Sequence, residues 1–165
     1  MLILGIDPGY AIVGWGVVSY QNNRFKPVGF GAITTPAEMP FDDRLEVIYD
    51  EMQEILRRYP VEGMAVETLF FTNNQKTAMA VSQARGVILL AGKKMGVPIH
   101  QYTPLQVKQA VVGYGRAEKK QVMEMTRLLL GLDRVPKPDD TADALALAIC
   151  HCHTAGSSLY RILKK

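Results

Sequence analysis

The chain has 165 residues, of which 48% are hydrophobic and 21% are charged, with a formal net charge of +3. At this length a single domain can bury a sizeable core, and no apolar run approaches the 18 residues of a membrane span, so we expect one soluble domain over residues 1–165. The amino terminus lacks the pattern of an export signal, and two cysteines are too few for a disulfide framework, so the cytoplasm is the expected location.

The first half of the chain predicts strands followed by a crossover helix. Residues 2–7, 12–20 and about 25–35 are rich in β-branched and aromatic residues and are separated by short turns, which predicts an antiparallel meander. Apolar residues recur at steps of three and four over 41–59, which predicts a helix. The next strand, 63–67, should therefore lie parallel to the first strand.

The second half is mostly helical. Residues 96–100 lead into a fifth strand, and the predicted helices cover 75–95, 104–112, 118–130 and 140 to about 153. This order of elements predicts an α/β fold in which helices cover one mixed sheet.

Four acidic residues fall where this fold could bring them together. Asp7 and Glu67 each end a predicted strand, whereas Asp140 and Asp143 lie three residues apart on one face of an alanine-rich helix that can approach the sheet closely. Four neighbouring carboxylates repel one another and need protons or cations. Oxygen ligands suit Mg²⁺ or Mn²⁺, and a pair of such ions can promote phosphodiester hydrolysis, so we expect a two-metal nuclease site.

Simpler explanations of these residues remain open. Asp7 could cap its own turn, and acids at a helix start favour the helix dipole. Asp139 is four residues from Asp143, so spacing alone does not decide which aspartate pairs with it. The run from Cys150 to His153 is not expected to hold zinc, because successive helical residues point to different faces.

Basic and aromatic residues near these acids are typical of a nucleic-acid surface. Phe70 and Phe71 follow Glu67, and one of them could stack on DNA bases. The basic residues lie on one predicted helix and around a glycine-rich bend, and they suggest one phosphate-binding face, although a solvated charged face explains them equally well. They are Arg85, Lys93, Lys94, Lys108, Arg116, Lys119 and Lys120.

Taken together, these motifs resemble the RuvC family of Holliday junction resolvases over nearly the whole chain. The matching segments are residues 5–9, Glu67 with its aromatic loop, and residues 82–86, 106–113 and 140–146. The resemblance implies a ribonuclease H-like fold with a mixed five-stranded sheet flanked by helices on both faces. It also implies a structure-selective DNA endonuclease that acts in recombination and repair.

The resemblance assigns roles to individual residues. It implies that two Mg²⁺ ions per subunit, or Mn²⁺ as a substitute, are held by Asp7, Glu67, Asp140 and Asp143. It favours Asp140 over Asp139 as the partner of Asp143. It implies that Phe70 contacts DNA near the crossover and that Lys108 and Lys119 engage phosphates, while Arg85, Arg116 and Lys120 are further candidate DNA contacts.

The resemblance also implies a homodimer that cuts four-way junction DNA symmetrically, and a branch-migration helicase as a partner. We expect the apolar stripe of the 75–95 helix to supply much of the dimer interface, through Val81, Ala84, Val87, Ile88, Ala91 and Met95. Two alternatives are an actin-like ATPase or kinase, and a junction-binding module without catalysis.

Overall fold

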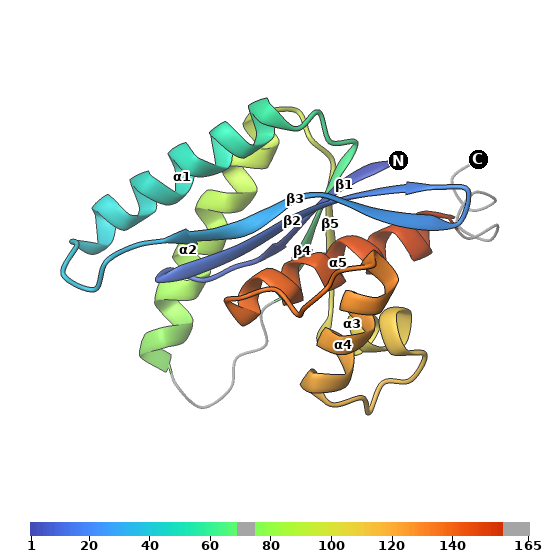
Figure 1. Ribbon diagram of the computed structural model, residues 1–165. Coiled ribbons are helices and arrows are strands. Elements are labelled where there is room, and N and C mark those ends of the chain that lie inside the picture. Colours follow the sequence, from blue (N-terminus) through green and yellow to red (C-terminus); the bar gives the residue numbers. More distant parts are fainter. Residues whose placement is uncertain (69–74, 157–165) are drawn as a thin grey trace.

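The computed structural model describes residues 1–68 and 75–156 (Figure 1). Every predicted helix and strand is present, with ends that differ by a few residues. The strands are β1 (Leu2–Asp7), β2 (Ile12–Gln21), β3 (Arg24–Thr34), β4 (Gly63–Glu67) and β5 (Ile99–Tyr102). The helices are α1 (Phe41–Arg58), α2 (Gln75–Lys94), α3 (Pro104–Val112), α4 (Lys119–Leu130) and α5 (Asp139–Gly156).

The described strands form one mixed sheet in the order β3-β2-β1-β4-β5. The first three strands are the antiparallel meander that the sequence predicts, and β4 lies parallel to both β1 and β5. Ile6 pairs with Val66 across the parallel ladder, one residue before each strand ends. Asp7 and Glu67 therefore lie side by side at the same end of two neighbouring strands.

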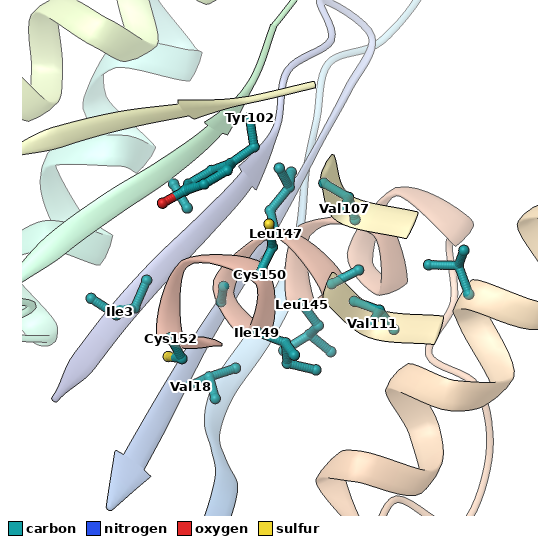
Figure 2. Close-up of a cluster of buried hydrophobic side chains, with 14 of the residues drawn as sticks. Ile3, Val18, Tyr102, Val107, Val111, Leu145, Leu147, Ile149, Cys150 and Cys152 are labelled. Carbon is teal, nitrogen blue, oxygen red and sulfur yellow. The ribbon is translucent and has the colours of Figure 1, made fainter. Parts of the chain in front are cut away.

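Helices cover both faces of the sheet, as expected (Figure 1). Leu4 and Ile6 of β1 are fully buried against α1 and α2, whereas Ile3 faces the opposite layer of α3, α4 and α5. Figure 2 shows this second core, in which Leu145 and Ile149 of α5 lie among side chains from the sheet and α3. No helix among the described residues is long and apolar enough to cross a bilayer.

The helix α5 packs unusually close to the sheet. A Cβ atom on Gly5 would lie 1.9 Å from the carbonyl oxygen of Ala144, and a Cβ atom on Gly14 would lie 1.9 Å from that of Asp140. Only glycine permits this contact, because the opposing atoms belong to the helix backbone. Gly14 is also the ladder partner of Asp7, so this approach brings the start of α5 directly beside the end of β1.

The expected dimer surface on α2 is wrong in part. Ala84, Ile88 and Ala91 are completely buried in the core that α2 shares with α1 and the sheet, so they cannot contact a second chain. The reason is that the apolar stripe of a surface helix packs against the sheet of its own chain, which leaves it unavailable to a second chain. The exposed face of α2 carries Met79 and Leu90 instead, with 66% and 53% of each residue accessible.

Candidate active site

Asp7 lies at the centre of an acidic cluster that draws on three separate elements. Its carboxyl group ends β1 beside Glu67 of β4, and the close approach of α5 adds Asp140 and Asp143. Burial is the main reason that the pKa of Asp7 is raised to about 8, and the negative charges of Glu67, Asp143 and Asp140 contribute to the same rise. The four acids named from the sequence therefore share one electrostatic environment.

Two other members of the cluster are perturbed in the same direction. Burial raises the pKa of Glu67, and the charge of Asp143 adds to the effect. The pKa of Asp143 is also raised by burial, against the opposing hydrogen bond from Lys119. A carboxylate in such surroundings is stabilised by a cation, and a set of oxygen ligands fits a hard divalent ion such as Mg²⁺.

The four carboxylates lie near one another, but their side chains do not surround a position that an ion could occupy. Within residues 1–68 and 75–156, no three acidic, histidine or cysteine side chains have a geometry that could hold an ion. Metal binding by the cluster therefore requires its side chains to turn toward each other.

Lys119 supplies positive charge inside the cluster. Its Nζ atom lies 2.8 Å from Oδ2 of Asp143 and 4.0 Å from Oδ2 of Asp139. The hydrogen bond to Asp143 raises the pKa of Lys119, and the lysine charge in turn offsets part of the rise in the pKa of Asp7 and of Glu67. The sequence alone suggested a phosphate contact for Lys119 but did not indicate this ion pair.

The side chain of Asp139 lies in different surroundings from that of Asp140. Its Oδ1 atom lies 2.6 Å from Nζ of Lys137, and that hydrogen bond lowers the pKa of Asp139. The side chain of Asp139 is 43% exposed, whereas Asp140 is among the charges that raise the pKa of Asp7. This arrangement favours Asp140 as the member of the cluster, which is the choice that the family resemblance implied.

A pocket of about 190 Å³ adjoins the acids. Two acids, Glu67 and Asp143, and two lysines, Lys108 and Lys119, line it. Its remaining walls are apolar and come from Pro104, Val107, Val122 and Leu147. A phosphodiester that reached the acids would thus lie close to both lysines, which are the two residues predicted to contact phosphates.

The structure places Arg85 in an internal contact. Its Nε atom donates a hydrogen bond of 3.0 Å to the carbonyl oxygen of Glu67, and its Nη2 atom donates one of 2.6 Å to Oε1 of Gln101. These bonds tie α2 to the ends of β4 and β5. Arg85 therefore positions the Glu67 backbone, a role that the sequence did not reveal because the partner is a main-chain oxygen.

Of the remaining predicted DNA contacts, the structure describes two. Arg116 and Lys120 are exposed on the segment between α3 and α4 and on α4 itself, next to Lys119. Phe70 and Phe71 lie outside the described residues.

Lys93 and Lys94 lie at the end of α2 that is farther from the acids, and a phosphate contact by them stays a prediction. They end α2 eight and nine residues beyond Arg85, about 12 Å along the helix, and the chain then begins β5 at the end of the strands opposite to Glu67.

Two features of the site were missed in the sequence, and only the first of them had a signal there. Gly14 and Gly16 alternate along β2, and glycines at alternate strand positions mark a close approach by another backbone. The hydroxyl of Thr141 donates a hydrogen bond of 3.0 Å to the carbonyl oxygen of Gly31, which fixes the start of α5 against β3. A threonine next to the acidic pair gave no comparable signal.

Comparisons with known proteins agree on one family. The family model described as crossover junction endodeoxyribonuclease RuvC matches residues 3–151. A protein of that name from Clostridioides difficile is 55% identical over 154 residues, which cover 93% of this chain and 91% of that protein. One from Caldanaerobacter subterraneus is 54% identical over 154 residues and covers 93% of each chain.

Solved structures lead to the same family. The structure of Thermus thermophilus RuvC superposes with a TM-score of 0.88 at 37% identity, covering 94% of this chain and 96% of that one. The same protein in complex with a Holliday junction substrate gives a TM-score of 0.87 at 35% identity. These matches confirm the ribonuclease H-like fold that the motifs implied. The chain therefore belongs to the RuvC family of crossover junction endodeoxyribonucleases.

Proposed function

We propose that this chain resolves four-way DNA junctions by paired, symmetric nicks, with Asp7, Glu67, Asp140 and Asp143 as the ligands of two Mg²⁺ ions per subunit. The observation that carries the proposal is that the ends of β1 and β4 and the start of α5 bring three more acids close to the buried Asp7. A buried carboxyl group whose pKa is about 8, surrounded by three more acids, is poorly suited to structural support and well suited to binding cations.

Different residues would bind the metal ions, position a metal ligand and neutralise the phosphate. Two bound Mg²⁺ ions would supply an activated water and would stabilise the departing 3′ oxygen, which leaves 5′-phosphate ends. The four acids hold that charge in place, and Arg85 keeps the backbone of Glu67 fixed. Lys108 and Lys119 neutralise the phosphate that enters the pocket. No side chain is needed as a nucleophile, so no covalent intermediate forms.

The substrate follows from the family and from the charge near the acids. One relative has been solved with a Holliday junction substrate bound. On this chain the phosphates would be bound by the lysines of the pocket together with Arg116 and Lys120, and Phe70 would stack at the crossover. Contacts of this kind recognise the shape of the junction and depend strongly on salt.

A homodimer is part of the proposal. A four-way junction is nearly two-fold symmetric, so matched cuts call for two sites related by a two-fold axis. The exposed face of α2, with Met79 and Leu90, is the candidate interface. We further propose that the chain works as one nuclease domain over residues 1–165, in the cytoplasm, beside a branch-migration helicase.

The direct test is incubation with a synthetic four-way junction in the presence and absence of Mg²⁺. Symmetric nicks that appear only with the ion are expected, and their absence at any Mg²⁺ concentration would contradict the proposal. Asp7→Asn should remove cleavage and keep junction affinity. An effect of ATP on the melting temperature would favour the ATPase alternative, and binding without cleavage would favour the non-catalytic module.

A further inference from the structure

We propose that Lys119 is a displaceable internal counter-ion: its ammonium group neutralises the acidic cluster in the metal-free protein and transfers to a DNA phosphate when the junction binds. Metal and DNA would then each strengthen the binding of the other. This inference rests on the proposed metal-binding role of the acids.

The first support is the position of the ammonium group. Lys119 begins α4, yet its Nζ atom reaches α5 and lies 2.8 Å from Oδ2 of Asp143. It also lines the same pocket as Glu67. An ammonium ion and a divalent ion on one carboxylate repel each other, so Lys119 has to withdraw from Asp143 before that group becomes a metal ligand.

The second support is that withdrawal is easy. The side chain of Lys119 is 58% exposed and that of Asp143 is 30% exposed, and ion pairs open to solvent are weak. The lysine stem is flexible, whereas the start of α4 is fixed by bonds that do not involve it. Glu118 and Gln121 form a reciprocal capping box there, in which the backbone amide of Glu118 donates a hydrogen bond of 2.8 Å to Oε1 of Gln121.

The third support is the destination of the ammonium group. Lys108 and Lys119 line the same pocket as Glu67 and Asp143. A phosphodiester that enters this pocket offers Lys119 a new anionic partner within reach of its present position. The phosphate thereby frees Asp143, and by linkage a bound metal must raise the affinity for DNA by the factor that DNA raises the affinity for metal.

The test measures Mn²⁺ binding to the DNA-free protein by electron paramagnetic resonance. Lys119→Met should bind Mn²⁺ more tightly than the wild type by about fivefold, or about 1 kcal/mol, because no ammonium group has to be displaced. Lys119→Arg keeps the charge and should stay near the wild type. Lys137→Met is the matched control, because Lys137 also pairs with an aspartate, Asp139, at 2.6 Å, and it should leave Mn²⁺ affinity unchanged.

A second measurement follows the linkage to DNA. Junction affinity is measured by fluorescence anisotropy with and without Ca²⁺, while gels verify that the junction stays uncut. Ca²⁺ should increase junction affinity by a larger factor in the wild type than in Lys119→Met. Equal factors would overturn the inference.

The outcomes separate this inference from the proposed function. If Asp7→Asn weakens Mn²⁺ binding while Lys119→Met binds Mn²⁺ no more tightly than the wild type, the counter-ion inference is wrong and the metal site stands. If Asp7→Asn leaves Mn²⁺ binding unchanged, the acids do not hold the metal and both proposals are wrong.

Discussion

The contact between Gly14 and α5 gives the most specific prediction for the active site. In Gly14→Ala, the new methyl group would lie 1.9 Å from the carbonyl oxygen and 2.2 Å from the carbonyl carbon of Asp140. Both atoms belong to the backbone, so no side-chain rotation can relieve the clash. Ordinary contact begins near 3.4 Å, and the start of α5 must therefore retreat by about 1.5 Å.

The retreat should affect stability modestly and activity severely. Overpacking a core typically destabilises by about 1 to 3 kcal/mol, which corresponds to a fall in melting temperature of roughly 2 to 12 °C at this size. Displacing catalytic groups by about 1 Å can slow a reaction on the order of 100-fold. Because Asp140 and Asp143 move with α5 while Asp7 stays on β1, we expect a loss of cleavage of at least that size.

The assay is single-turnover junction cleavage at a temperature where circular dichroism shows the variant to be folded. Gly63→Ala is the matched control, because a methyl group there meets its nearest neighbour, Cδ1 of Ile3, at an ordinary 3.4 Å. That variant should cleave at close to the wild-type rate. A folded Gly14→Ala protein with near wild-type cleavage would refute the idea that backbone contact between α5 and the sheet positions the acids.

Three further predictions address charge, assembly and positioning. Folded Asp7 keeps its proton up to about pH 8, far above its ordinary value near 3.8, so metal-free protein should lose stability as pH rises between these values. The slope is at most about 1.4 kcal/mol per pH unit, and Asp7→Asn should flatten it; a flat wild-type profile in thermal melts would contradict this. Leu90→Glu should give a monomer by light scattering, whereas Leu128→Glu, at a comparably exposed position, should remain dimeric; the reverse result would exclude the α2 interface. Arg85→Met should slow cleavage through Glu67 without changing the salt dependence of junction binding, and a slope reduced by about one would instead show a phosphate contact.

The order of elements could be predicted because each carries its own local signal. Apolar residues alternate or recur with the periodicity of strands or helices, and the helical crossover before residues 63–67 fixes the parallel pairing of β4 with β1. The convergence of Asp7 and Glu67 follows from that pairing alone. Side-chain partners could not be predicted in the same way, since Arg85 binds a main-chain oxygen and Lys119 crosses from α4 to α5.

Two expectations for α2 were incomplete for a common reason. The apolar stripe of α2 and the basic residues along the same helix were interpreted from sequence spacing, which gives relative directions around a helix. Spacing does not say which direction faces the sheet or which helix end lies near the acids. The burial of Ile88 shows which face of α2 packs on the sheet, and the contact between Arg85 and Glu67 shows which part of α2 lies near the acids. Lys93 and Lys94 lie farther along the helix, away from the site.

The central claim is that four carboxylates from β1, β4 and α5 hold two divalent ions beside a DNA phosphate. Anomalous diffraction from crystals grown with Mn²⁺ and junction DNA tests it most directly. We predict two peaks, with oxygen atoms of Asp7, Glu67, Asp140 and Asp143 as their protein ligands. Peaks bound elsewhere, or acids that remain turned apart around a bound junction, would contradict the account.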